Sequence, residues 1–118
     1  MTRVLIVDDQ ISFRRQLRQL LHVAGLTVIA EACDIDEAEQ QVRTTLPDLA
    51  IVDVMLPGVN GIEGAARLKA IAPNLRVILI SAYRDRAEIF RTGAREAGAE
   101  TFISKDDLDL AMVRTWKR

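Results

Sequence analysis

The stretch Arg3-Val4-Leu5-Ile6-Val7-Asp8-Asp9 is a short apolar run that ends in two adjacent acids. Nearly continuous apolar runs are typical of parallel strands that are buried on both faces of a sheet. Ligands of open α/β sheets bind outside the carboxyl ends of such strands. Three later runs also end in a residue that can take part in a reaction, so the chain predicts one reactive edge. They are Leu49-Ala50-Ile51-Val52 before Asp53, Val77-Ile78-Leu79-Ile80 before Ser81, and Glu100-Thr101-Phe102-Ile103-Ser104 before Lys105.

A single Asp after a strand is weak evidence for function, because Asp is also a favoured helix N-cap. Asp9 could cap the helix that follows it, and this would leave Asp8 unexplained. Capping does not require two adjacent acids together with a third acid, a hydroxyl and a lysine at matching strand ends. The combined pattern therefore favours a functional site.

The composition limits the classes of protein to consider. With 118 residues, 49% of them hydrophobic, the chain can form one domain with its own core. Its net charge of −1 predicts no general attraction to nucleic acid or to an anionic membrane. The only cysteine, Cys33, is expected to be a small buried hydrophobe, and the only histidine, His22, argues against a His-rich metal site. Without a signal peptide or an apolar run that could span a bilayer, we expect a soluble cytoplasmic protein.

Strand-like and helix-like segments alternate along the chain. The expected strands are 3–8, 26–32, 48–53, 75–80 and 100–104, and the expected helices are 12–24, 35–45, 61–72, 84–97 and from about 107 onward. Ser12 would open the first helix, Asp34 or Asp36 would cap the second, and Gly25 and Gly98 would each follow the end of a helix. Five β-α units of this kind imply a parallel sheet with helices on both faces and right-handed crossovers. Apolar residues of the first helix recur at helical spacing, at Phe13, Leu17, Leu20, Leu21 and Ala24.

As an ordered set, the motifs resemble the receiver domain of bacterial two-component response regulators, and the resemblance covers essentially all of residues 1–118. It implies a flavodoxin-like fold, which is a doubly wound five-stranded parallel sheet of order 2-1-3-4-5 with five helices. The residues that carry the resemblance are Val7-Asp8-Asp9, Asp53 with Met55-Leu56-Pro57-Gly58 and Gly61, Ser81-Ala82, and Ala97-Gly98-Ala99 followed by Lys105.

The resemblance implies a phosphoryl-transfer role for the residues at the strand ends. Asp53 matches the acceptor that takes a phosphoryl group from a histidine kinase or a phosphotransfer protein as an acyl phosphate. Ser81 matches the hydroxyl that hydrogen-bonds this group, and Lys105 matches the ammonium that pairs with it. Phe102 occupies the aromatic position that turns inward on activation, so Ser81 and Phe102 would form the switch. The alternative for Phe102 is a plain core aromatic.

The resemblance also implies a Mg²⁺ site. Asp8 and Asp9 match the acidic pair that holds the ion together with Asp53 and the backbone carbonyl of Met55. The residue types support this interpretation independently, because three converging carboxylates repel one another and resist ionising together. A divalent cation relieves that repulsion, and a set of ligands made only of oxygen favours a hard ion.

The sequence departs from the usual family pattern in two places. Asp106 follows Lys105 where the family usually has proline, a change familiar in regulators with a LuxR/NarL-like output domain. The stretch between Ser81 and Lys105 is slightly longer than usual, and the extra residues are expected within 84–96. The arginines of that segment would form a solvated helix face, or alternatively a docking surface.

Two other classes of function fit parts of the pattern. A phosphatase with an aspartyl nucleophile would commonly carry a general acid two residues later, where this chain has Met55, so we do not expect an enzyme. A phosphorylation-independent interaction module of the same fold would lack the acceptor or the lysine, and both are present. The expected partners are therefore a histidine kinase or phosphotransfer protein and, after phosphorylation, a second copy of the chain. No helix-turn-helix is recognisable, so direct binding to nucleic acid is not expected, and the sequence leaves open whether an output domain follows.

Overall fold

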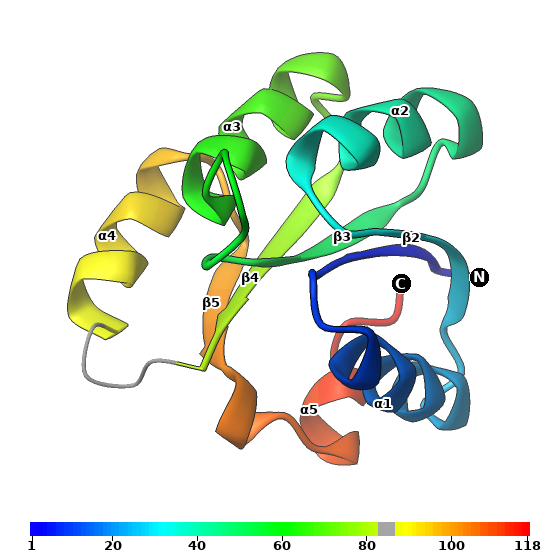
Figure 1. Ribbon diagram of the computed structural model, residues 1–118. Helices are drawn as coiled ribbons and strands as arrows, with labels where there is room; N and C mark the ends of the chain where they lie inside the picture. Colours follow the sequence, from blue (N-terminus) through cyan, green and yellow to red (C-terminus); the bar gives the residue numbers. More distant parts are fainter. Residues whose placement is uncertain (83–86) are drawn as a thin grey trace.

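The computed structural model describes residues 1–82 and 87–118, with the backbone alone for Ala87 and Glu88. These residues form a five-stranded sheet in which all neighbouring strands are parallel, in the order β2-β1-β3-β4-β5 (Figure 1). The predicted doubly wound, flavodoxin-like topology is confirmed. The strands are β1 (Arg3–Val7), β2 (Thr27–Ala32), β3 (Leu49–Asp53), β4 (Arg76–Ser81) and β5 (Thr101–Ser104).

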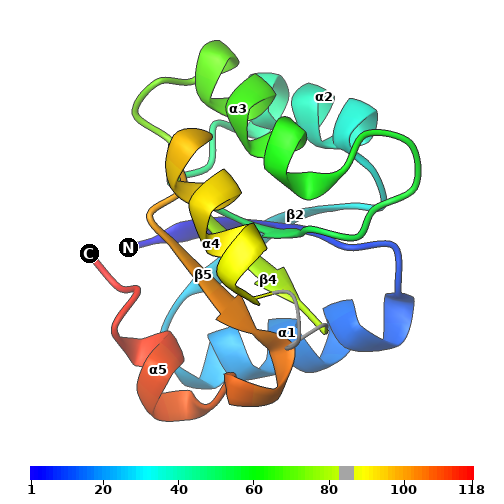
Figure 2. The same cartoon turned by 90° about the vertical axis from the view of Figure 1, so that its left-hand side faces the viewer.

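Helices cover both faces of the sheet. One face packs against α1 and α5, and the other packs against α2, α3 and α4 (Figures 1 and 2). Within the described residues, no helix has the length and apolar character needed to cross a membrane. The helices are α1 (Ile11–Val23), α2 (Ile35–Thr45), α3 (Gly61–Ile71), α4 (Ala87–Glu96) and α5 (Leu110–Arg114), with a 3₁₀ turn η2 (Lys105–Asp107) after β5.

Alternate residues of each central strand enter two different cores. In β1, Leu5 and Val7 pack on the side of α2 and α3, while Val4 and Ile6 pack on the side of α1 and α5. All five residues of β3 are buried. Burial on both faces explains why the strands appear in the sequence as continuous apolar runs rather than as alternating patterns.

The start of α1 differs from the prediction. Its N-cap is Gln10, whose side chain makes no capping hydrogen bond, so neither Asp9 nor Ser12 caps this helix. The Asp8 carboxylate accepts a hydrogen bond from the Gln10 amide at 2.8 Å. Asp8 thus forms a turn just before the helix, and α1 begins without a side-chain cap.

The later helix ends agree with the sequence in part. Asp34, not Asp36, caps α2, because its side chain accepts a hydrogen bond from the Glu37 amide at 2.8 Å. Gly98 follows α4 with a φ of +88°, as predicted for a residue beyond a helix end. Positions 84–86 of the predicted fourth helix lie outside the described residues. The predicted last helix is present, but its start at about 107 is wrong, since the chain first makes the η2 turn and α5 begins at Leu110.

Gly61 begins α3 directly against the backbone of β3. A Cβ atom at this position would lie 2.1 Å from the carbonyl oxygen of Asp53 and 2.8 Å from the Cα of Val54. The Gly61 amide donates a hydrogen bond to the Val54 carbonyl at 2.8 Å. This close approach requires glycine, because any side chain would push α3 away from the end of β3.

Gly61→Ala should lower the free energy of unfolding by about 2 to 3 kcal/mol, because a methyl group there overlaps backbone atoms that cannot rotate away. Urea denaturation would measure the loss. The matched control is Gly93→Ala in α4, where the new Cβ would meet only the side-chain end of Ile62, at 3.1 Å. That variant should change stability by less than about 1 kcal/mol, since alanine is the better helix former. Equal losses in both variants would contradict this interpretation of Gly61.

Candidate functional site

The carboxyl ends of β1, β3, β4 and β5 meet along one edge of the sheet (Figure 1). Their register places Val7 beside Val52 and Ser81 beside Ser104, so the strands end near one another. The residues that follow β1 and β5 and the residue that ends β3 consequently converge. Asp8, Asp53 and Lys105 are in direct contact there, and Ser81 ends the neighbouring strand.

Lys105 is the cation of this site. Its Nζ lies 2.8 Å from Oδ2 of Asp8 and 3.3 Å from Oδ2 of Asp53. A third contact comes from α1, where the ring centroid of Phe13 lies 4.0 Å from the same nitrogen. Only 11% of the lysine side chain is exposed. Lys105 is therefore a largely buried, paired ammonium and not a solvated loop charge.

The two adjacent acids occupy different environments. Asp8 is fully buried, and its two carboxylate oxygens are used by the Gln10 amide and by Lys105. Its backbone carbonyl accepts a hydrogen bond from the guanidinium of Arg14, which also pairs with Glu31 on β2. Asp9 is exposed. Asp8 is thus fixed by contacts within the protein, while the Asp9 carboxylate is accessible to an ion from solvent.

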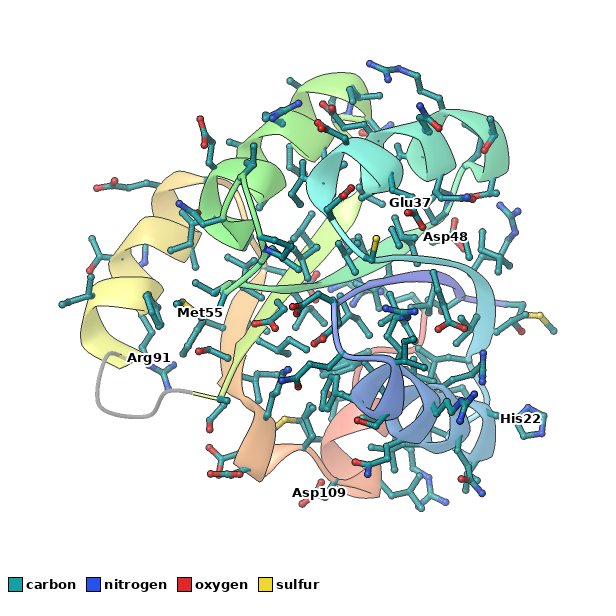
Figure 3. The ribbon with its side chains drawn as sticks, in the orientation of Figure 1. His22, Glu37, Asp48, Met55, Arg91 and Asp109 are labelled. Carbon is teal, nitrogen blue, oxygen red and sulfur yellow. The ribbon has the colours of Figure 1, made fainter. Side chains whose placement is uncertain are left out.

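Asp53 is a buried acid with a perturbed pKa. Its Oδ1 accepts a hydrogen bond from the Met55 amide at 3.0 Å. Burial raises the pKa of Asp53 from 3.8 to about 6, and the nearby Asp8 charge adds to this effect. Lys105 and the Met55 amide oppose it, because both stabilise the ionised carboxylate. The Met55 side chain itself is partly exposed at the start of the loop after β3 (Figure 3).

The three acids are close enough together to hold a hard divalent cation. Asp8, Asp9 and Asp53 each offer a carboxylate oxygen, and these oxygens lie within 4.8 Å of one another. Oxygen ligands from a cluster of like charges suit Mg²⁺. The observed donor set therefore fits the ion that the sequence predicts. The Met55 amide donates a hydrogen bond to Asp53. The role of the Met55 carbonyl as a metal ligand stays a prediction.

The two predicted switch residues are both buried. Ser81 ends β4 and is fully buried. The Phe102 ring lies 5.7 Å from the ring of Phe90, and the guanidinium carbon of Arg91 lies 5.7 Å from the Phe102 centroid. Arg91 extends from the middle of α4 (Figure 3). Phe102 is thus a buried ring between β5 and α4, which agrees equally with a switch residue and with a core aromatic.

Cys33 and His22 occupy exposed positions. The prediction that Cys33 is buried is wrong, because β2 ends at Ala32 and the chain turns outward there into the cap of α2. The Cys33 thiol donates a hydrogen bond to Glu37 at 3.2 Å, and this bond raises the pKa of the thiol. His22 extends from α1 into solvent (Figure 3).

Sequence reasoning missed two side chains that contact the site. Phe13 fits the apolar spacing of α1 and was expected to belong only to the core, whereas its ring also contacts the Lys105 ammonium. Arg14 carries no motif of its own, although it donates to the Asp8 carbonyl. The only feature of the sequence that could have indicated a role for either residue is its position in the first turn of the helix that follows the paired acids.

Comparison with known proteins identifies the family. The family model of the response regulator receiver domain matches residues 4–113, and the chain belongs to this family. A putative transcriptional regulator of Pseudomonas aeruginosa is 38% identical over 105 residues, which are 89% of this chain and 50% of that protein. The chain thus spans about half the length of that relative.

Solved structures of similar proteins agree with this assignment. A two-component response regulator of the LuxR family from Aurantimonas sp. SI85-9A1 has a TM-score of 0.88 at 31% identity, covering 98% of this chain and 81% of that one. A structure of the CheX–CheY–BeF3–Mg²⁺ complex from Borrelia burgdorferi has a TM-score of 0.86 at 33% identity, covering 97% and 84%. The receiver resemblance is confirmed, and the similar solved structures include a regulator of the LuxR family.

Asp53→Asn should stabilise the metal-free protein at neutral pH. The folded protein holds a proton on Asp53 up to a pKa of about 6, whereas the ordinary value is 3.8. The folded state therefore binds more protons between these values, and the free energy of unfolding falls as pH rises through this window. Above it, the ionised acid costs up to about 3 kcal/mol. Because Lys105 loses one of its two carboxylate partners in the variant, a net gain of about 1 to 2 kcal/mol is expected.

Urea denaturation in EDTA, at about pH 7.5 and about pH 4, measures this difference. The gain should be present at the higher pH and absent at the lower one. Asp36→Asn, at an acid whose side chain is 84% exposed, is the matched control and should show neither effect. An advantage of the Asp53 variant that is the same at both pH values would contradict the raised pKa.

Proposed function

We propose that residues 1–118 form the phosphoacceptor domain of a two-component response regulator, with Asp53 as the acceptor. The carrying observation is the buried Asp53 carboxylate at the end of β3, which lies 3.3 Å from the Lys105 ammonium and has Asp8 and Asp9 within reach of a shared cation. Family membership supports a histidine kinase or a phosphotransfer protein as the donor. We expect the reaction to take place in the cytoplasm.

The chemistry assigns a separate task to each residue. An Asp53 oxygen attacks the phosphorus of the donor, and the bond from phosphorus to the leaving group breaks, with the electron pair departing on that group. An acyl phosphate remains on Asp53. The Lys105 ammonium pairs with the phosphoryl charge, and the Ser81 hydroxyl donates a hydrogen bond to it. A pKa of about 6 keeps Asp53 largely ionised, and hence nucleophilic, at neutral pH.

We propose Mg²⁺ as the ion of the acidic cluster, held by Asp8, Asp9, Asp53 and the Met55 carbonyl. When bound, the ion supplies positive charge that neutralises the phosphoryl oxygens during transfer. The carboxylate oxygens within 4.8 Å of one another support this assignment, as does the similar CheY chain that was solved with BeF3 and Mg²⁺.

The alternatives receive less support from the site. Met55 stands two residues after the acceptor and offers no general acid, so we do not propose an enzyme acting on separate phosphoesters. A phosphorylation-independent module would have no need of a buried acceptor paired with an ammonium, since burial of charge is costly.

We propose that a phosphorylation-dependent homodimer forms, and that the domain itself binds neither nucleic acid nor membrane.

Asp53→Asn should abolish phosphorylation by acetyl phosphate with Mg²⁺, because a neutral amide is not a nucleophile. Intact-mass measurement after quenching would show the added phosphoryl group in the wild type and none in the variant. Asp36→Asn is the matched control for the same chemical change at an exposed position and should be phosphorylated normally. An unchanged phosphorylated fraction in the Asp53 variant would remove this residue from the acceptor role.

The same assay tests the metal ligands. Asp9→Asn changes the exposed member of the acidic cluster without removing a partner of Lys105. This variant should require more Mg²⁺ for the same rate, and EDTA should stop the reaction in every variant. A rate that is independent of Mg²⁺ would contradict the metal site.

We also propose that Ser81 and Phe102 form the switch. The two residues lie on neighbouring strands, with Leu79 of β4 beside Phe102 and Ser81 beside Ser104. Phe102 contacts Phe90 and Arg91, so its position is coupled to α4. Phosphorylation would shift an existing equilibrium by drawing Ser81 toward the phosphoryl group, and Phe102 would move into the space that Ser81 leaves.

Ser81→Ala should uncouple phosphorylation from the face formed by α4 and β5 while Asp53 still accepts phosphate. Hydrogen exchange of residues 87–104, with and without BeF3 and Mg²⁺, measures the coupling. The wild type should respond and Ser81→Ala should respond much less. Ser104→Ala removes another buried hydroxyl at the same register and should behave as wild type. If Ser81→Ala responds like the wild type, Ser81 is not the coupling residue.

A further inference from the structure

We infer that Phe13 is a positioning residue whose aromatic face holds the Lys105 ammonium in place for phosphoryl transfer. This inference rests on the function proposed above for Lys105. It concerns a residue of the first turns of α1, outside the acids, the hydroxyl and the lysine of the site.

The contact has the geometry of a cation–π interaction. Nζ of Lys105 lies 4.0 Å from the centroid of the Phe13 ring. Such contacts extend to about 6 Å and strengthen when the cation is removed from water. The lysine side chain is only 11% exposed, so this one is largely shielded from solvent.

The backbone around Lys105 gives its ammonium little support. Lys105 begins η2, a single 3₁₀ turn in which the Leu108 amide approaches the Lys105 carbonyl at 3.4 Å. The lysine stem is flexible, with four carbons to order. A small cavity of about 120 Å³ also adjoins it, lined by Phe13, Gln16, Leu17, Leu20, Lys105 and Leu108. Contacts at the ammonium, rather than close packing of the stem, therefore decide where the charge lies.

The ring is well placed to provide one of these contacts. Phe13 belongs to a 13-residue helix anchored in the core by the buried side chains of Leu17 and Leu21. Its position is consequently fixed by the body of the protein and not by the η2 turn. The flexible Lys105 side chain thus contacts an aromatic ring whose position is fixed by the helix.

The three described contacts of the ammonium are not equivalent. Asp8 and Asp53 are also candidate metal ligands, and Asp53 is the acceptor that changes chemically during the reaction. The Phe13 ring takes no part in either event. It attracts the ammonium without competing for a phosphoryl oxygen, so it retains Lys105 at the site while its carboxylate partners are engaged by the ion or by phosphate.

The test is a double-variant cycle on the initial rate of phosphorylation by phosphoramidate with Mg²⁺. Phe13→Leu keeps an apolar side chain but removes the ring, and it should slow the reaction about tenfold. Phe13→Tyr keeps the aromatic face and should restore most of the rate. In a Lys105→Gln background, Phe13→Leu should have little further effect, because the cation on which the ring acts is gone. Leu20→Met alters the same cavity away from the ammonium and should leave the rate unchanged.

A spectroscopic readout makes the inference independent of activity. In the wild type, the ε-methylene protons of Lys105 should resonate upfield because of the ring current of Phe13, and Phe13→Leu should abolish that shift. The inference is overturned if Phe13→Leu keeps the wild-type rate, if it slows Lys105→Gln by the same factor, or if Leu20→Met slows the reaction as much. If the wild-type protein takes no phosphate, the proposed function is overturned. In that case the ring-current shift still tests whether Phe13 contacts Lys105.

Discussion

Two buried carboxylates share one ammonium, and the rest of this structure is organised around that pairing. Removing a charge from water costs several kcal/mol unless a partner of opposite charge compensates it. Asp8 and Asp53 are both buried at neighbouring strand ends, and Lys105 is within 2.8 and 3.3 Å of them. The compensation works only if the residues that follow β1 and β5 lie beside Asp53, the last residue of β3. The strand order and register achieve this, with β1 and β3 adjacent in the centre of the sheet.

The partners of Asp53 stabilise its charge only in part, and this partial stabilisation suits the acceptor role proposed for it. Lys105 and the Met55 amide do not fully offset the burial of Asp53, whose pKa remains raised to about 6. A stronger set of partners would stabilise the carboxylate and weaken it as a nucleophile, whereas fewer partners would leave it protonated at neutral pH. Asp53 is thus ionised at neutral pH but less stabilised than an ordinary exposed carboxylate, which fits the acceptor role proposed for it. Natural proteins commonly lose some stability at such sites.

The sequence predicted the sheet well and the loops less well, for physical reasons. Strands buried on both faces leave continuous apolar runs, and the residues after those runs meet at one edge, so Asp8, Asp53 and Lys105 could be expected to converge. Helix ends depend instead on single hydrogen bonds. The Asp8 carboxylate turned toward the Gln10 amide, and α1 began without a side-chain cap. The last helix started later than expected because the chain first made the η2 turn.

Apolar periodicity also hides the chemistry of Phe13. Helical spacing reports which face of α1 is buried, and an aromatic residue satisfies that pattern whether its ring meets leucine or an ammonium. The same ring can do both, because its edge packs on apolar neighbours while its face attracts a cation. Phe13 packs against the core shared by α1 and α5 and also contacts Lys105. Through this residue, α1 is therefore joined to the edge of the sheet that carries Lys105. A change in how α1 packs would move the ring, and with it the charge that faces Asp53.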